Sequence, residues 1–339
     1  MNEAEIILLV AQRFNKSSDF LEVGIGDDTA VLKSQLSATA RHLLTTDTLI
    51  EGVHFDLRYM SLSDVGYKAL AVNLSDINAM GGVSSFALGT LGVPRDATTA
   101  DIDALLDGIE DALALCAQAG QQCSVIGGDT VSAPQWTVGF TVMGQVDGMP
   151  LLRSGASVGD DLWHSGTLGL SGIGWQRLAS NAGAKHASPE TCSVEAGRAG
   201  VTPMVEAHIR PAPPLALGPW LQQNGIATAA QDLSDSLSQV SLQLAAASGV
   251  GVEFDFRDYA FEPELIAFAQ GRPVAELLLA QAEDYQLLFT VPPEKAEALA
   301  AAALPLTRIG KVVEAARGSS YIDERGEQHP LLASGFEHF

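Results

Sequence analysis

The chain has 339 residues, enough for two domains of ordinary size, each with its own apolar core. Hydrophobic residues make up 47% of the chain and charged residues 18%, which excludes an intrinsically disordered protein. The formal net charge of -22 excludes a protein that binds nucleic acid or anionic membranes through clustered basic residues.

The cysteines and the amino terminus indicate where the protein works. Cys116, Cys123 and Cys192 are odd in number and lack the C-x-x-C spacing of a structural zinc site. The first 14 residues combine acids with helical apolar spacing, unlike the basic start of a signal peptide. No apolar run is long enough to span a bilayer. We therefore expect a cytoplasmic protein.

The first half of the chain alternates between helical and strand-like apolar spacing. In chain order, the predicted elements are a helix ending near residue 14, strands near 29–33 and 42–49, a mostly buried helix from Ser61 or Ser63 to Gly81, a strand near 85–93, a helix near 99–119 and a strand near 136–146. Turn residues then gather in QVDGMPLLRSGASVGDD, which predicts a domain boundary near Gly148.

The second half again mixes helices and strands. Its clearest predicted elements are helices at 234–248 and 274–279 and strands at 286–291 and 306–312. The fold class is therefore α/β (α+β), with two mixed α/β domains covering residues 1–147 and 148–339.

Several aspartates stand where an acid needs an explanation. Asp27 and Asp28 are adjacent in GIGDDTAVL, and burying adjacent carboxylates is costly unless a cation compensates them. Asp47 ends a strand-like run between threonines, Asp129 follows two glycines in GGDT, and Asp76 continues a stripe of small apolar residues on the long helix. A turn residue or an acid in the last turn of a helix would account for Asp47 or Asp76 taken alone.

Asp232 and Asp235 lie three residues apart in DLSDSL, at a predicted helix start where Ser234 is the candidate N-cap. Simple helix capping explains this motif as well as phosphate binding does. Taken together, however, the acids predict a site for Mg²⁺ and a polyphosphate, because Mg²⁺ prefers oxygen ligands. No histidine cluster favours zinc, and no G-x-x-x-x-G-K-[ST] loop is present.

A series of motifs carries a family resemblance over nearly the whole chain. In order, they are GIGDDTAVL, TTDTLIEGVHF, KALAVNLSDINAMGG, IGGDT, RSGASVGD, DLSDSL, AEDYQLLF and GFEHF. The chain resembles the thiamine-monophosphate kinase family, within the superfamily of aminoimidazole-ribonucleotide synthetase and selenophosphate synthetase. Most fragments occur across the superfamily, whereas TTDTLIEGVHF together with NLSDINAMG points to the kinase branch.

The resemblance implies a homodimer in which the amino-terminal sheets of two copies form a shared β-barrel, with ATP bound near that interface. It implies several Mg²⁺ ions, ATP as co-substrate and thiamine monophosphate as the phosphate acceptor. The implied metal ligands are Asp28, Thr45, Thr46, Asp47, Asp76, Asp129, Asp232 and Asp235. Among these acids, Asp47, Asp129 and Asp235 are expected to be catalytic.

The same resemblance assigns residues to the two substrates. Gly128, Asp129, Arg153 and Ser234 correspond to ATP contacts. His54, Glu283 and Phe336 correspond to the thiamine-phosphate pocket, where an aromatic ring could stack on the cationic heterocycle and a carboxylate could offset its charge. Without the resemblance, His54 and Phe336 would be interpreted as core residues.

Two departures from the family pattern lie in the carboxyl half. Gln281 and Ala282 replace the paired glycines that usually precede the Glu-Asp motif, and Ser236 stands where glycine is usual. If the backbone at these positions needs a positive φ or a close ligand approach, Ala282 and Ser236 introduce strain or crowd the acceptor site.

Two alternatives remain beside the kinase. One is another ATP-using member of the superfamily, such as selenophosphate synthetase or an amidine-forming ligase. The selenophosphate branch would need a reactive cysteine near the amino terminus, whereas the first cysteine here is Cys116. The other is a nucleotide-binding protein without catalytic activity.

Overall fold

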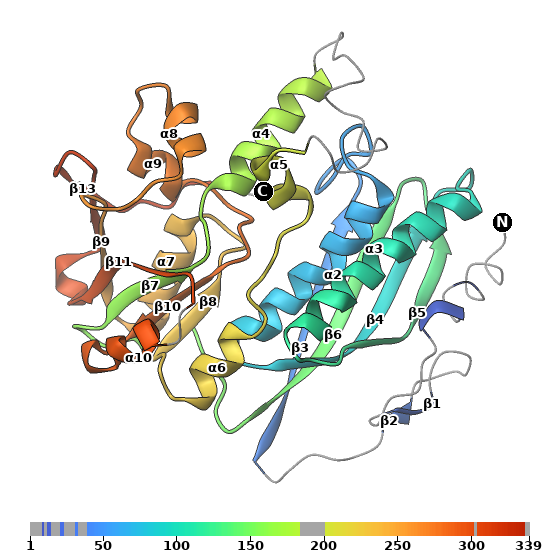
Figure 1. Ribbon diagram of the computed structural model, residues 1–339, viewed down its shortest axis with the longest axis horizontal. Helices are drawn as coiled ribbons and strands as arrows, with labels where there is room; N and C mark the ends of the chain where they lie inside the picture. The colour runs from blue at the N-terminus through green and yellow to red at the C-terminus, as the bar shows by residue number, and fades with distance from the viewer. Residues whose placement is uncertain are drawn as a thin grey trace. The chain divides into compact units, whose positions relative to one another are not determined.

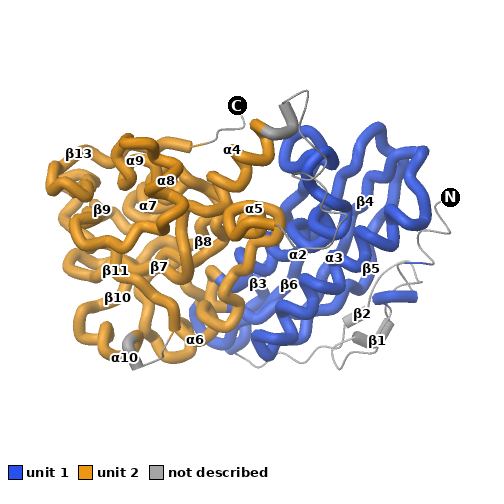
Figure 2. Tube along the Cα trace, turned by 45° about the horizontal axis from the view of Figure 1, so that its top comes forward, with its two compact units in different colours: residues 1–78, 82–149, 181–200 blue, residues 79–81, 150–180, 201–339 orange. Residues whose placement is uncertain are grey.

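The computed structural model describes residues 39–183, 201–301 and 304–335, together with residues 9, 12–14, 21–23 and 31–32. The chain divides into two compact units, which Figure 2 distinguishes by colour. Unit 1 comprises residues 1–78, 82–149 and 181–200, and unit 2 comprises residues 79–81, 150–180 and 201–339. Each unit contains its own sheet and helices, so the expectation of a mixed α/β fold is confirmed.

Unit 1 is built on a four-stranded sheet with the order β3-β6-β4-β5. Its strands are β3 (Ala40–Ile50), β4 (Val83–Val93), β5 (Ser124–Ser132) and β6 (Thr137–Asp147). β3 and β4 pair antiparallel with β6, whereas β4 and β5 are parallel. A parallel pair needs a crossover connection, which α3 supplies between β4 and β5.

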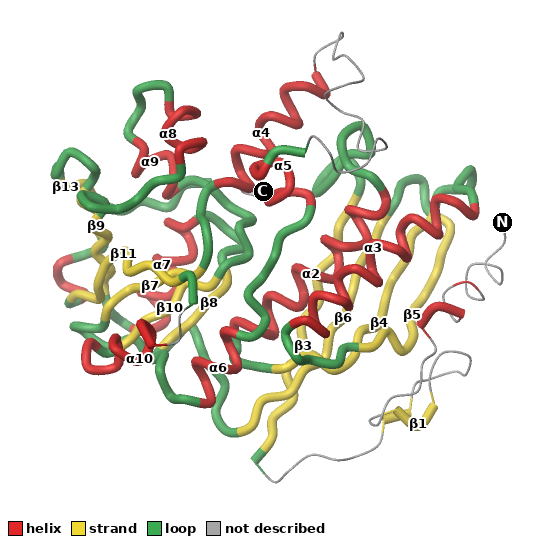
Figure 3. Tube along the Cα trace, viewed as in Figure 1, coloured by secondary structure: helices red, strands yellow, loops and turns green. Residues whose placement is uncertain are grey.

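Helices α2 (Leu62–Ala79) and α3 (Thr99–Gln118) cover one face of this sheet (Figures 1 and 3). A capping box starts α3, because the Thr98 hydroxyl accepts from the Asp101 N–H and the Asp101 carboxylate accepts from the Thr98 N–H. The two helices approach closely at Gly108, where an added Cβ would lie 1.8 Å from the Ser63 carbonyl oxygen. Glycine at this position lets α2 and α3 pack.

The amino-terminal part of unit 1 is described in pieces. Residues 9 and 12–14 are helical, as predicted, and Arg13 donates to Asp103 and Asp107 of α3 at 3.1 and 2.5 Å. β1 (Leu21–Val23) and β2 (Val31–Leu32) form an antiparallel pair.

Unit 2 is built on a seven-stranded sheet with the order β13-β12-β9-β11-β7-β10-β8. Its strands are β7 (Asp161–Ser165), β8 (Ala229–Asp232), β9 (Gly251–Asp255), β10 (Leu287–Val291), β11 (Leu306–Val313), β12 (Ser320–Ile322) and β13 (Gln328–Pro330). The pairing is antiparallel except between β9 and β12.

Unit 2 also contains helical elements, and buried side chains from several of them form a core that includes Leu162, Val240 and Phe254. The helical elements are α4 (Leu170–Gly183), α5 (Pro203–Ile209), α6 (Leu217–Gln223), α7 (Leu237–Ser248), α8 (Pro263–Ala269), α9 (Val274–Leu279), α10 (Ala296–Ala301) and the short 3₁₀ turns η3 (Pro293–Lys295) and η4 (Ala315–Arg317).

The predicted elements are found with shifts of a few residues at their ends, and two local expectations were wrong. Asp129, expected at the end of a strand, lies inside β5, because that strand continues to Ser132, whereas Asp47 lies inside β3 as the predicted strand at 42–49 already had it. The N-cap of α7 is Ser236, whose hydroxyl accepts from the Gln239 N–H at 3.2 Å, so the helix starts two residues later than a Ser234 cap requires. Within the described residues, no helix combines the length and apolar character needed to cross a membrane.

Candidate active site

Three of the predicted metal ligands of unit 1, Thr45, Asp47 and Asp76, lie where β3 faces α2. The Thr45 hydroxyl donates to Asp76 Oδ2 at 2.5 Å, and the Asp47 N–H donates to Asn73 Oδ1 at 2.9 Å. Asn73 is fully buried, and its side-chain amide donates to the Ala69 carbonyl at 2.9 Å, which fixes its orientation. Helical spacing places Asn73 and Asp76 on the same side of α2, so one helix face holds both contacts.

The two carboxylates of this contact influence each other. Desolvation, followed by the charge of Asp76 and a hydrogen bond to it, raises the pKa of Asp47 to about 6. A carboxylate pair of this kind is stabilised by a cation, and the local donors are carboxylate and hydroxyl oxygens. The donor set therefore fits Mg²⁺ and offers no soft ligand for zinc.

Asp129 lies at the other edge of the same sheet. Across the sheet, Asp129 pairs with Thr90, Thr90 with Gly139, and Gly139 with Thr48. Asp47, by contrast, pairs with Phe140. The Cα atoms of β3 and β5 are therefore about three strand spacings apart, roughly 14 Å.

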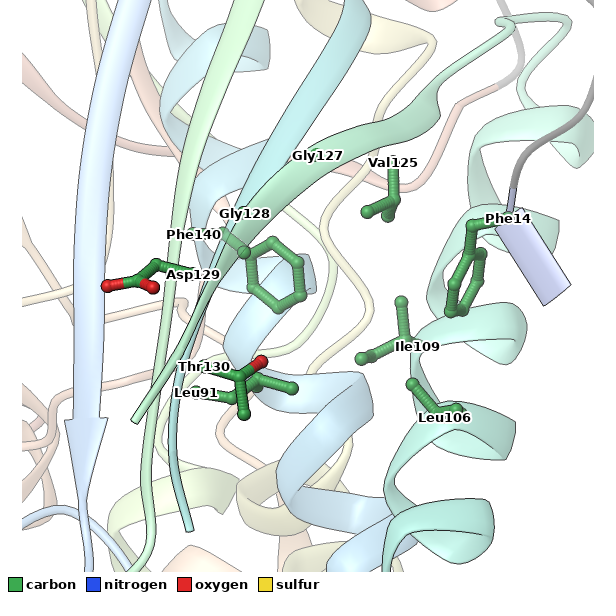
Figure 4. Close-up of a pocket in the computed structure, with 11 residues that line it drawn as sticks. Phe14, Leu91, Leu106, Ile109, Val125, Gly127, Gly128, Asp129, Thr130 and Phe140 are labelled. Atoms are coloured by element: carbon green, nitrogen blue, oxygen red, sulfur yellow. The ribbon is translucent and has the colours of Figure 1, made fainter. Parts of the chain in front are cut away.

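The two rows also face opposite sides of the sheet. Figure 4 shows Phe140 turned toward Leu106 and Ile109 of α3, while the Asp129 carboxylate points away from that helix. Since paired residues in adjacent strands share a face, Asp47 lies on the helix side and Asp129 on the open side. Metal–oxygen bonds are about 2.1 Å long, so Asp47 and Asp129 of one chain cannot bind the same ion.

Thr46 lies on the open side with Asp129. Its hydroxyl donates to the Phe140 carbonyl at 3.0 Å and accepts from the Thr141 hydroxyl at 3.2 Å. Gly128 precedes Asp129, and a Cβ there would lie 2.0 Å from the Gly89 carbonyl oxygen, so only glycine fits between these strands. Gly127 and Gly128 also border an apolar cavity of about 70 Å³ against α3.

His54 lies in the turn that follows β3. Its ring Nδ1 accepts the Ile50 N–H at 3.1 Å, and the backbone N–H of His54 donates to the Ile50 carbonyl at 2.9 Å. These contacts hold the ring at the carboxyl end of β3, four residues beyond the end of the strand.

In unit 2, pairing between β8 and β10 brings two predicted motifs together. Asp232, which is 4% exposed, ends β8 opposite Leu287. The Glu283 N–H donates to the Ser234 carbonyl at 3.0 Å, so the predicted acceptor motif lies directly against the predicted ATP motif.

Asp235 and Arg153 are both held by α7. Gln243 donates to Asp235 Oδ2 at 3.4 Å and accepts from Gln231 at 2.6 Å. At the carboxyl end of the helix, the Ser248 hydroxyl donates to the Arg153 carbonyl at 3.1 Å. A single helix thus orients the two motifs.

The segment that contains Glu283 has an unusual backbone. Glu283 and Tyr285 have φ angles of 61° and 50°, in the left-handed region that non-glycine residues rarely adopt. The positive φ angles therefore do not fall at Ala282, and Ser236 has an ordinary φ of -63°. The two departures from the family pattern cause no left-handed strain at their own positions.

Three neighbours of Glu283 and Asp47 were not predicted from the sequence. For Asn73, the only indication in the sequence was a polar residue in an otherwise apolar helix. For His208, the sequence gave no indication of a functional role. Asp284 stands next to Glu283 in AEDYQLLF, and that adjacency could have drawn attention to it. Its carboxylate accepts the Gly169 N–H at 2.7 Å and the Ser171 N–H at 3.4 Å, at the start of α4.

Two predicted site residues, Asp28 and Phe336, lie outside the described residues. Among the residues that are described, a group of three metal-type donors occurs at Asp323, Glu327 and His329 rather than at the predicted acids. The Asp323 carboxylate accepts the N–H groups of Arg325 and Glu327 and contacts His329, which closes the β12–β13 hairpin.

Known proteins match the chain along its length. The family model "AIR synthase related protein, N-terminal domain" matches residues 26–146, and the corresponding C-terminal domain model matches residues 157–323. The thiamine-monophosphate kinase of Bacillus subtilis (strain 168) is 34% identical over 349 residues, covering 100% of both chains.

Solved structures agree with the sequence matches. The thiamine-monophosphate kinase of Stenotrophomonas maltophilia K279a is similar with a TM-score of 0.77 and 34% identity, covering 96% of this chain and 98% of that one. AaThiL complexed with AMPPCP and TMP is similar with a TM-score of 0.73 and 30% identity, covering 99% and 97%. The chain belongs to the thiamine-monophosphate kinase family.

Proposed function

We propose that this protein transfers the γ-phosphoryl group of ATP to thiamine monophosphate and so forms thiamine diphosphate. The main support is the similarity over 99% of the chain to AaThiL, which was solved with AMPPCP and TMP. The juxtaposition of Ser234 and Glu283 in unit 2 is consistent with adjacent binding of nucleotide and acceptor.

The proposed reaction needs little acid–base chemistry. The acceptor is a phosphate whose second pKa is about 6, so it is already an anion at neutral pH. The protein therefore has to hold two polyanions in line and offset their charge, and no covalent intermediate is required.

Mg²⁺ bound at the acids would neutralise the phosphate oxygens and orient the terminal phosphate of ATP. In unit 1, Thr45, Asp47 and Asp76 would hold one ion, with Asn73 fixing the backbone of Asp47. In unit 2, Asp232 and Asp235 would hold others. Asp28 is included among the proposed metal ligands because of the family resemblance.

The remaining assignments follow the two domains. Residues 1–147 would bind ATP and metal through Thr46, Gly128 and Asp129, and residues 148–339 would complete the site with Arg153 and Ser234. His54, Glu283 and Phe336 would contact the acceptor. Glu283 is suited to this role because a carboxylate attracts the cationic thiazolium ring.

A homodimer would unite the two edges of the unit 1 sheet. Asp47 on β3 and Asp129 on β5 are too far apart to share an ion within one chain. If two sheets close into a barrel with β5 of one copy beside β3 of the other, the edge that carries Asp129 comes next to the edge that carries Thr46 and Asp47, and Asp129 shares the open side with Thr46. The open face supports this arrangement, because Leu44, Leu88 and Val131 on it are 69%, 43% and 49% exposed.

Mixing two inactive variants tests this shared site. Asp47→Asn and Asp129→Asn proteins, unfolded together and refolded as mixed dimers, would form one intact site in half of the dimers. We expect about a quarter of wild-type activity to return. If Asp47 and Asp129 served the same chain's site, no activity would return.

The choice of acceptor is tested by measuring ADP release with thiamine monophosphate, the aminoimidazole precursor and selenide in parallel. The kinase proposal predicts ADP release with thiamine monophosphate alone. Isothermal titration separates the non-catalytic alternative, which predicts binding of ATP and Mg²⁺ without binding of thiamine monophosphate.

A further inference from the structure

A buried histidine contacts the glutamate assigned to the acceptor. His208 lies on α5, is 1% exposed, and places its Nδ1 3.2 Å from Glu283 Oε2. The Ser171 hydroxyl lies 3.3 Å from the same nitrogen. An ionised carboxylate can only accept a hydrogen bond, so His208 Nδ1 carries the proton and donates it toward Glu283.

The backbone of Glu283 is fixed independently of this contact. Its φ of 61° is strained for a residue with a side chain, and such strain persists only where the surroundings enforce it. The Glu283 N–H donates to the Ser234 carbonyl at 3.0 Å, and the next residue, Asp284, anchors the segment to the Gly169 N–H at 2.7 Å. These contacts fix the main chain, so the contact with His208 acts on the side chain of Glu283.

The side chain of Glu283 is 33% exposed, so its carboxylate combines a buried contact on one side with access to solvent on the other. We propose that His208 is a positioning residue: its Nδ1–H selects the rotamer of Glu283 that presents the second carboxylate oxygen to the cationic ring of the acceptor. This inference rests on the proposed function. It assigns acceptor affinity, rather than phosphoryl transfer, to a residue that does not itself touch the substrate.

Two substitutions separate the hydrogen bond from the bulk of the ring. His208→Leu fills similar space but removes the donor, whereas His208→Asn keeps an N–H close to the position of Nδ1. We expect the Leu variant to raise KM for thiamine monophosphate about tenfold or more, because a hydrogen bond to a charged group is lost. The Asn variant should restore most of the affinity, and neither variant should change KM for ATP.

A second buried histidine provides the control. His164 is 2% exposed and bonds to the Tyr259 hydroxyl at 3.1 Å and to the Ser165 carbonyl at 3.0 Å. His164→Leu removes a buried imidazole from the same unit, and it should leave KM for thiamine monophosphate unchanged. Equal increases in KM for His164→Leu and His208→Leu would overturn the proposal.

A double-mutant cycle with Glu283→Gln gives the sharpest result. If His208 acts through the Glu283 carboxylate, His208→Leu should raise KM in the wild-type background and change it little in the Glu283→Gln background. Additive effects would contradict the proposal. A wild-type protein that phosphorylates thiamine monophosphate, together with an unchanged KM in His208→Leu, would refute this inference alone. A wild-type protein without that activity would refute the proposed function and this inference with it.

Discussion

The Thr45 hydroxyl donates to Asp76 Oδ2 at 2.5 Å, across the contact between β3 and α2. This hydrogen bond brings Asp76 to the strand that carries Asp47, whose pKa is raised to about 6 by desolvation and by the charge of Asp76. Two carboxylates are thus held together at a cost that a bound cation would remove.

Replacing the Asp47 carboxylate should have opposite effects on the stability of the metal-free protein and on its activity. We expect Asp47→Asn to abolish turnover while the metal-free protein melts at a higher temperature than the wild type, because the like-charge contact is lost. Mg²⁺ should raise the melting temperature of the wild type and have little effect on the variant.

The control is Asp96→Asn, which removes an exposed acid of the same unit. It should keep the wild-type response to Mg²⁺. An undiminished Mg²⁺ response in Asp47→Asn would mean that the ion binds elsewhere.

Asp284 should make stability depend on pH. Burial raises its pKa to about 7, against the effect of the N–H groups of Gly169 and Ser171, which lower it. Between about pH 4 and pH 7 the folded state holds a proton that the unfolded state releases, so the free energy of unfolding falls as pH rises through this range. Denaturant unfolding at pH 5 and pH 8 should show a decrease that is smaller in Asp284→Asn. Equal pH slopes in the two proteins would show that Asp284 has an ordinary pKa.

The helix pair of unit 1 should be sensitive to a single methyl group at Gly108. A Cβ there would lie 1.8 Å from the Ser63 carbonyl oxygen, and neither backbone can move without separating α2 from α3. We expect Gly108→Ala to lower the free energy of unfolding by ~3 kcal/mol, although alanine favours helix more than glycine does. At the exposed Ala114 of the same helix, Ala114→Gly should cost ~1 kcal/mol. A gain in stability from Gly108→Ala would contradict the packing described here.

Two left-handed residues should respond differently to glycine. Gln270 ends α8 with a φ of 51°, and Glu283 has a φ of 61° in the acceptor segment. Gln270→Gly should stabilise the fold by ~1 kcal/mol without changing kinetics, because glycine removes the penalty of the left-handed backbone. Glu283→Gly should gain similar backbone relief but raise KM for thiamine monophosphate, and an unchanged KM would remove Glu283 from the acceptor site.

Local pattern was enough to predict most elements and one part of the candidate site. The apolar spacing of residues 61–81 predicted a buried helix with Asp76 in its stripe, and the structure has α2 with Asp76 in contact with Thr45. The face of the sheet on which Asp129 lies could not be predicted, because it depends on register. A one-residue slip reverses the face, and the β4–β5 pairing shifts register between Ala87 and Leu88.

The features of the candidate site that could not be predicted from the sequence depend on long-range packing. The contact between His208 and Glu283 joins α5 to a segment about 75 residues later, and nothing near His208 in the sequence indicates it. The positive φ at Glu283 and Tyr285 was equally hidden, since glycine is the usual signal for such backbone.

Phosphorus NMR of the purified protein with ATP, Mg²⁺ and thiamine monophosphate tests the proposed phosphoryl transfer most directly. We expect the monophosphate signal to decline while the two coupled signals of a thiamine diphosphate appear, and we expect chelation of Mg²⁺ to stop the change. Conversion of ATP to ADP and free phosphate, with thiamine monophosphate left intact, would contradict the proposed transfer.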